Sequence, residues 1–170
     1  LLIILSQQSK TGIFQHEDDP RYSHRIRDSN GYGSGDIPIF SSTALNERYY
    51  GTLQGMEKIA AERKFGKEKV RAWRRGYTDR PPRGESLEEA HARMHPYLVK
   101  KILPRVKRGE NIIVTAHGNT LRAAIKHLEK ISDQEISYVD LPAARPLVYE
   151  YRNGGFVRIA GEYRMDRPLR

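Results

Sequence analysis

A histidine followed by a glycine stands where an apolar run of the sequence gives way to a helical pattern. Residues 111–116, NIIVTA, are mostly β-branched or apolar, which predicts a strand buried in a parallel sheet. After His117 and Gly118, apolar residues recur at helical spacing. A lone histidine more often has a structural role. At the carboxyl end of a strand, however, free N–H groups of a helix start favour anions, so this corner predicts an anion site.

The carboxyl group of Glu47 is the second candidate for chemistry, in the stretch LNERYYG. Burial beside Tyr49 and Tyr50 would favour its protonated form and suit it to proton donation, whereas a nearby Arg48 would favour the ionised form. The alternative is a surface Glu–Arg pair with packing tyrosines. Taken without context, the surface pair is the simpler interpretation, and the sequence alone leaves both open.

The stretch RAWRR at residues 71–75 places Arg74 and Arg75 next to the only tryptophan. Guanidinium groups match phosphate and carboxylate bidentately, so the pair could clamp such an anion, although a solvated basic helix face is the alternative. The 30 Lys and Arg against 21 Asp and Glu give a net charge of +9, which attracts anions in general. Because the basic residues are not interleaved with aromatic residues along one surface, we expect no nucleic-acid partner.

Other features exclude several classes of protein. The chain has no cysteine, so it has neither a disulfide framework nor thiol chemistry. His91 and His95 are spaced i, i+4, but no HExxH motif accompanies them, so we expect a solvated helix face and no metal. The longest apolar run, LLIIL at residues 1–5, is far shorter than a bilayer span, so we expect no membrane partner.

The elements that must position these groups can be predicted from caps, spacing and turn residues. Ser86 and Glu89 form a capping-box pattern, which predicts a helix from there to about Leu103. A similar pattern starts a short helix at Ser132. The remaining predictions are two short helices at 56–64 and 67–75, a structured loop at 45–55, a Pro-rich linker at 76–84, a hairpin of 146–151 with 156–160, and a surface-loop insertion at 15–36.

The motifs LNERYYGTLQG, WRR, GESL, VTAHGNTLRA and LPAARPLVYEY follow one another between residues 44 and 151. In this order they resemble the cofactor-dependent phosphoglycerate mutases of the histidine phosphatase superfamily. The resemblance implies an α/β protein with a three-layer α/β/α fold and a mostly parallel central sheet, as a single domain over residues 1–170. It implies a cytoplasmic isomerase of glycolysis and gluconeogenesis that interconverts 3-phosphoglycerate and 2-phosphoglycerate through a phosphohistidine. The primer would be 2,3-bisphosphoglycerate, and the binding partners would be small phosphorylated substrates. The resemblance leaves open whether the chain forms a homo-oligomer.

The resemblance also implies a role for each matching residue. Glu47 would be the general acid/base at the substrate hydroxyl, and His117 would stabilise charge on the transferring phosphoryl group. The substrate phosphate and carboxylate would be held by Arg48, Tyr49, Tyr50, Lys58, Arg74, Arg75, Gly118 and Asn119.

The sequence departs from the family pattern in three places. The Arg-His-Gly motif that carries the nucleophilic histidine is not in the chain, nor is the Ser/Arg/Ala helix that follows it. We therefore expect an incomplete N-terminal part, with residues 1–5 ending that helix, marginal stability, and no turnover by this chain alone. Residues 143–145, Ala-Ala-Arg, replace the usual Thr-Gly and apolar residue, and the insertion at 15–36 is long. The alternatives are a phosphomonoesterase of the same superfamily and a non-catalytic, anion-binding pseudoenzyme module.

Overall fold

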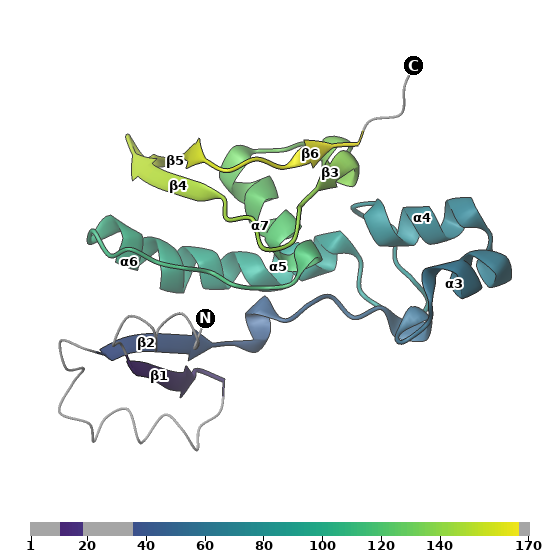
Figure 1. Ribbon diagram of the computed structural model, residues 1–170, viewed down its shortest axis with the longest axis horizontal. Helices are drawn as coiled ribbons and strands as arrows, with labels where there is room; N and C mark the ends of the chain where they lie inside the picture. The colour runs from purple at the N-terminus through teal and green to yellow at the C-terminus, as the bar shows by residue number, and fades with distance from the viewer. Residues whose placement is uncertain (1–10, 19–35, 167–170) are drawn as a thin grey trace. The chain divides into compact units, whose positions relative to one another are not determined.

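The computed structural model describes residues 11–18 and 36–166, which belong to two compact units divided after Leu45 (Figure 1). In the first unit, strand β1 (Thr11–His16) pairs in parallel with β2 (Asp36–Ser41), and a 3-10 helix, η1 (Thr43–Leu45), follows. The predicted insertion at 15–36 lies mostly outside the described residues. Its first two residues nevertheless belong to β1, and its last residue begins β2.

The second unit contains most of the helices. Helix α5 (Leu87–Tyr97) continues through a π-helical segment, η3 (Leu98–Ile102), into α6 (Leu103–Lys107), so this helical stretch ends slightly later than predicted. Helix α7 (Gly118–Glu129) packs against α5 (Figure 1). The other helical elements are η2 (Gly51–Leu53), α3 (Lys58–Phe65), α4 (Lys67–Arg75) and η4 (Glu135–Tyr138).

Local sequence signals determine where these helices begin and end. At the start of α5, Ser86 Oγ accepts the Glu89 N–H at 3.1 Å, and the Glu89 carboxylate accepts the Ser86 N–H at 2.8 Å. The predicted capping box is thus confirmed. Helices α3 and α4 are separated by Gly66, whose φ of 89° is readily adopted only by glycine. The predicted break between two short helices is therefore also confirmed, although α3 begins two residues later than predicted.

The buried apolar side chains come from the faces that the helices turn toward one another. A small cluster joins η2, α3 and α4, where the rings of Phe65 and Trp73 meet edge to face with centroids 5.4 Å apart. Helices α5 and α7 provide the rest, together with η3, η4 and β3. The buried apolar residues of the described chain are Leu53, Ala61, Val70, Trp73, Leu87, Ala90, Met94, Leu98, Ala123, Ile125, Ile136 and Val139.

Two antiparallel strand pairs complete the second unit. Strands β4 (Val148–Arg152) and β5 (Gly155–Ala160) form a hairpin, as predicted from the Asn-Gly-Gly turn between them. Strand β3 (Val139–Asp140) pairs with β6 (Arg164–Met165). The described chain therefore mixes helices with one parallel and two antiparallel strand pairs. No helix in the described ranges is long and apolar enough to cross a bilayer.

The prediction of a buried strand at residues 111–116 is wrong for the structure described. This segment pairs with no other described strand, and the side chains of Ile113 and Val114 are 77% and 37% exposed. A β-branched run becomes a strand only when a neighbouring backbone satisfies its N–H and C=O groups, so composition alone was insufficient. The segment still leads directly into His117, the residue that precedes α7.

Candidate active site

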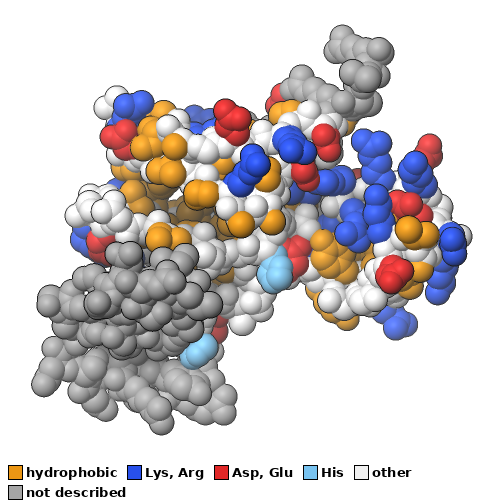
Figure 2. All heavy atoms as spheres, in the orientation of Figure 1, with side chains coloured by type: hydrophobic (Ala, Val, Ile, Leu, Met, Phe, Trp, Pro, Cys, Tyr) orange, Lys and Arg blue, Asp and Glu red, His pale blue; other side chains and the backbone are white. Residues whose placement is uncertain are grey.

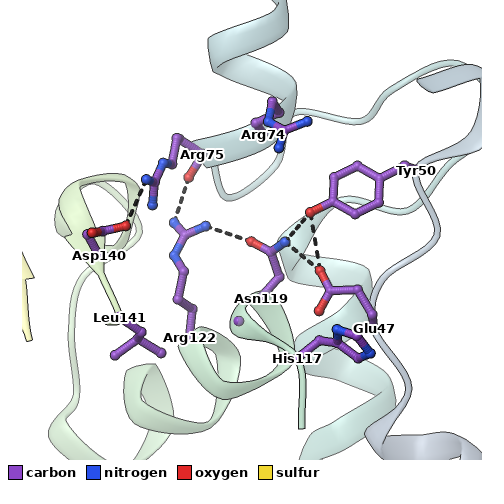
Figure 3. Close-up of a pocket in the computed structure, with 10 residues that line it drawn as sticks. Glu47, Tyr50, Arg74, Arg75, His117, Asn119, Arg122, Asp140 and Leu141 are labelled. Carbon is purple, nitrogen blue, oxygen red and sulfur yellow. Dashed lines mark hydrogen bonds and ion pairs between the residues drawn. The ribbon is translucent and has the colours of Figure 1, made fainter. Parts of the chain in front are cut away.

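A cavity of about 350 Å³ opens in the second unit between the end of α4, the start of α7 and the segment after β3 (Figure 3). Its walls combine carboxylates, cations and amide groups from segments far apart in the sequence. The lining residues are Glu47, Tyr50, Arg74, Arg75, His117, Gly118, Asn119, Arg122, Asp140 and Leu141.

The two oxygens of the Glu47 carboxylate have different surroundings. Oε1 accepts hydrogen bonds from the Asn119 side-chain amide at 2.5 Å and from the Tyr50 hydroxyl at 3.2 Å. Oε2 is buried and has no hydrogen-bond partner among the described residues. The first oxygen is therefore held in place, while the second, although it is buried, is left without a donor and can still accept a proton.

The start of α7 forms the floor of the cavity. His117 is exposed and immediately precedes the helix, and its carbonyl accepts the Leu121 N–H at 2.9 Å. A Cβ atom added to Gly118 would meet nothing within 4 Å, so the space beside the first residue of the helix is open. Thr120 Oγ1 donates to the Asn46 carbonyl at 2.8 Å, which fixes the helix start beside the segment that carries Glu47. Unpaired N–H groups there can bind an anion.

Two arginines at the end of α4 provide the cations that face the cavity. Arg75 donates to the Asp140 carboxylate at 2.8 Å and to the Val139 carbonyl at 3.3 Å. The Arg74 guanidinium carbon lies 5.7 Å from the centroid of the Tyr50 ring. The adjacent arginines that the sequence suggested as a clamp therefore both line one cavity.

Arg122 was not identified from the sequence. Its side chain is buried, and it donates to Asn119 Oδ1 at 2.9 Å and to the carbonyls of Arg75 and Ile136 at 2.8 and 2.5 Å. Burial lowers the pKa of Arg122 to about 10, with a smaller contribution from the positive charge of Arg75. Because a guanidinium only donates, it holds the Asn119 oxygen toward itself and directs the amide nitrogen to Glu47. The i, i+3 spacing from Asn119 was the available sequence signal.

Arg48 does not line the cavity. Its side chain is 1% exposed and donates to the carbonyls of Trp73 at 2.5 Å and Glu85 at 3.4 Å. Burial lowers its pKa. The guanidinium carbon also lies 5.0 Å from the Tyr50 ring centroid, so Arg48 supports a residue of the cavity wall from behind. The surface Glu–Arg pair considered from the sequence is therefore not formed between Glu47 and Arg48.

Tyr49 and Lys58 also lie outside the cavity lining. Tyr49 is 56% exposed, and its backbone N–H donates to the Glu85 carboxylate at 3.0 Å. The Lys58 side chain is 66% exposed and lies 3.6 Å from Glu62, one helical turn away. The binding roles implied for these two residues stay predictions. Basic side chains do gather over α3 and α4 (Figure 2), which favours the approach of anions.

Three histidines form a cluster between α5 and α7, away from the cavity. The ring centroids of His91, His95 and His127 are 4.5 to 6.3 Å apart, and all three side chains are partly buried. Burial lowers the pKa of His91 and His127, and the nearby His95 lowers both further. The expectation of a solvated helix face for His91 and His95 is wrong, because α7 packs over them. Within the described ranges, no such cluster is arranged to hold a metal ion.

Comparison with known proteins places these features in a family. The model of the histidine phosphatase superfamily (branch 1) matches residues 26–160. The chain is 44% identical to 2,3-bisphosphoglycerate-dependent phosphoglycerate mutase 1 of Gloeobacter violaceus over 83% of this chain and 61% of the relative. It is 40% identical to the 2,3-bisphosphoglycerate-dependent phosphoglycerate mutase of Methanosarcina acetivorans, over 93% of this chain and 70% of that protein. The corresponding protein of Chlamydia pneumoniae is 41% identical, over 90% and 68%.

Solved structures support the fold. A mycobacterial glucosyl-3-phosphoglycerate phosphatase superposes with a TM-score of 0.61 at 18% identity, covering 96% of this chain and 81% of that chain. This likeness confirms the α/β fold expected from the sequence. The chain spans 61% of the Gloeobacter relative and 70% of the Methanosarcina relative. The matches in sequence and fold show that the chain belongs to the 2,3-bisphosphoglycerate-dependent phosphoglycerate mutases of the histidine phosphatase superfamily.

Proposed function

We propose that this chain supplies the substrate-binding and proton-transfer groups of an isomerase of glycolysis and gluconeogenesis, which interconverts 3-phosphoglycerate and 2-phosphoglycerate through a phosphohistidine intermediate. The observation that carries this proposal is the cavity itself. The cavity is lined by the Glu47 carboxylate, one oxygen of which has no hydrogen-bond partner, together with Arg74, Arg75 and the start of α7. A phosphorylated hydroxy acid needs these groups: cations for its charges and a base for its hydroxyl.

Phosphoryl transfer depends mainly on positioning and on donors around the phosphoryl oxygens. Arg74 and Arg75 would bind the phosphate and carboxylate of the substrate. His117 and the first N–H groups of α7 would donate to the transferring phosphoryl group. Glu47 would accept a proton from the substrate hydroxyl at Oε2 and return it, while Asn119 and Tyr50 hold Oε1.

The same residues fit the primer, 2,3-bisphosphoglycerate. The open space beside Gly118 would take one phosphate group, and the two arginines would supply positive charge. When bound, the primer supplies the phosphoryl group that charges the nucleophilic histidine. The Arg-His-Gly motif that the family resemblance assigns to this histidine does not occur in the 170 residues. We therefore expect this chain by itself to bind phosphoglycerates without turning them over.

Calorimetric titration of the chain with 3-phosphoglycerate tests the binding half of the proposal. We expect Arg75→Ala to weaken binding by about 10- to 100-fold, because a bidentate charged contact is lost. Arg71→Ala is the matched control, because Arg71 is exposed on the same helix and does not line the cavity. Equal effects of the two substitutions, or no binding by the unmodified chain, would refute the proposed function.

An activity assay separates the remaining possibilities. With 3-phosphoglycerate and primer present, the chain alone should produce neither 2-phosphoglycerate nor inorganic phosphate. Formation of 2-phosphoglycerate would refute the expectation that the nucleophile is missing. Release of phosphate without isomerisation would favour the phosphomonoesterase alternative. Salt-sensitive binding to DNA or RNA, unaffected by 3-phosphoglycerate, would favour the non-catalytic module.

A further inference from the structure

The glutamate of the GESL motif does not line the cavity, and the proposed function gives it no role. Glu85 precedes the Ser86 cap of α5, and its side chain pairs with Arg93 in the second turn of that helix. Arg93 Nε donates to Glu85 Oε1 at 3.2 Å, and Arg93 Nη2 donates to Oε2 at 3.0 Å. The two groups therefore form a bidentate ion pair, a geometry that holds both side chains in one orientation.

The ion pair binds the backbone on both sides of Glu47. Oε2 of Glu85 accepts the Tyr49 N–H at 3.0 Å, and Arg93 Nη2 donates to the Asn46 carbonyl at 3.2 Å. The Glu85 backbone N–H also donates to the Tyr49 carbonyl at 2.7 Å. The residue before Glu47 and the second residue after it are thus both held by this pair.

Neighbouring contacts leave the same backbone little room to move. The Asn46 carbonyl also accepts the Thr120 hydroxyl at 2.8 Å, so side chains from α5 and α7 hold one oxygen atom together. A Cβ atom added to Gly84 would lie 2.7 Å from the Tyr49 carbonyl oxygen. The chain just before α5 therefore packs directly against the segment that carries the cavity carboxylate.

Both members of the pair are charged at neutral pH. Burial alone would raise the pKa of the Glu85 carboxyl, but hydrogen bonds from Arg93 and from the Tyr49 N–H lower it below its ordinary value. The side chains of Arg93 and Glu85 are 28% and 27% exposed, so solvent screens their attraction only in part. Removing either partner would leave a partly buried charge and a backbone group of the segment with fewer hydrogen bonds.

We propose that Glu85 and Arg93 are positioning residues, which hold the backbone on both sides of Glu47 so that its carboxylate stays in the cavity wall. This inference rests on the proposed function, because it takes Glu47 as the group that exchanges a proton with the substrate. Neither Glu85 nor Arg93 lines the cavity, so the pair acts through the segment that carries Glu47 and Tyr50. Proton transfer requires a base held within hydrogen-bond reach of the substrate hydroxyl, and the ion pair supplies that support.

The side-chain amide of Asn119 reports the position of Glu47 without any ligand. It donates to Glu47 Oε1 at 2.5 Å and to the Tyr50 hydroxyl at 2.6 Å, and neither bond involves the ion pair. In a 1H–15N NMR spectrum, its two hydrogen-bonded protons should resonate apart from those of the exposed Asn153 side chain. An ion pair that only stabilised the fold would leave these signals unchanged in a folded variant.

The substitution Glu85→Gln removes one charge of the pair and keeps an oxygen that can accept the Tyr49 N–H. Glu88→Gln is the matched control, because it removes the same charge from an exposed side chain in the first turn of α5. We expect Glu85→Gln to move the Asn119 amide signals partway toward those of Asn153, and Glu88→Gln to leave them in place. Equal effects of the two substitutions would overturn the inference.

Replacing Arg93 gives a stronger and a milder change at the same position. Arg93→Met removes the pair, and the Asn119 signals should then lie close to those of Asn153. Arg93→Lys keeps the charge without the bidentate contact, so its signals should lie between these and the signals of the unmodified chain. Signals of Arg93→Met that match the unmodified chain would contradict the positioning role. If Arg93→Met does not fold, as judged by Trp73 emission, unshifted signals in Arg93→Lys contradict it equally.

Calorimetric titration with 3-phosphoglycerate separates this inference from the proposed function. We expect Arg93→Met to weaken binding by about two- to tenfold, because the ligand must then order a loosened wall, and Glu88→Gln by less than about twofold. Part of the loss should remain in Arg93→Lys, which keeps the positive charge. A chain that does not bind 3-phosphoglycerate contradicts the proposed function, while shifted Asn119 signals would still support the positioning of Glu47. Binding together with unresponsive Asn119 signals would refute the positioning role alone.

Discussion

Replacing Arg122 by methionine removes a buried guanidinium group that donates hydrogen bonds to Asn119 and to two backbone carbonyls beside the cavity. Its three hydrogen bonds from a charged donor contribute about 1.5–3 kcal/mol each. Burial opposes this, and the lowering of its pKa from 12.5 to about 10 corresponds to about 3 kcal/mol. We therefore expect Arg122→Met to lower the free energy of unfolding by about 2–5 kcal/mol, because two carbonyls and the Asn119 oxygen lose their donor.

Urea denaturation followed by tryptophan fluorescence measures this loss. Trp73 is the only tryptophan and is 8% exposed, so its emission reports the unfolding of the region around α4. Arg71→Met, on the exposed face of α4, is the control and should change the free energy of unfolding by less than about 0.5 kcal/mol. A loss below about 1 kcal/mol for Arg122→Met would show that the buried guanidinium contributes no net stability, and the reasoning from its hydrogen bonds would be wrong.

Three further predictions concern stability. The pKa values of His91 and His127 are lowered in the folded chain, so the unfolded chain binds more protons and the free energy of unfolding should fall as the pH drops below about 6.5. Urea titrations at pH 8 and pH 5.5 measure this fall, and His127→Asn should make it smaller. Ser86→Ala should cost about 1 kcal/mol in the same measurement, whereas Ser86→Gly should cost less than Ser86→Ala. Gly51→Ala should lower the melting temperature, since its φ is 56° and the new Cβ would lie 2.1 Å from the Pro82 carbonyl oxygen; Gly55→Ala, also at positive φ but without a close neighbour, should lower it less.

Elements specified by local signals were predictable from the sequence. The capping box at Ser86, the break at Gly66 and the hairpin after Arg152 each depend on residues within a few positions of one another. The conformation of segment 111–116 was not predictable, because a strand requires a neighbouring strand to pair with, and the segment itself does not specify one. A β-branched composition describes what a strand can be made of, and the neighbouring backbone decides whether it forms.

The candidate site shows the same limit at the level of side chains. Motif order was sufficient to select Glu47 and Asn119, which the structure joins by a hydrogen bond. It did not distinguish Arg75, which lines the cavity, from Arg48, which is buried against backbone carbonyls. Arg122 looks like any helical cation in the sequence, because its importance comes from acceptors contributed by two other elements.

The cavity is assembled from segments that meet only when the second unit is folded. An anion that occupies it binds the native chain and has no comparable site on the unfolded one. At one hundred times its dissociation constant, such a ligand would add about 2.7 kcal/mol to the stability of the chain. The fraction of folded molecules would then rise with the concentration of the phosphorylated acid, because the ligand binds only the folded chain.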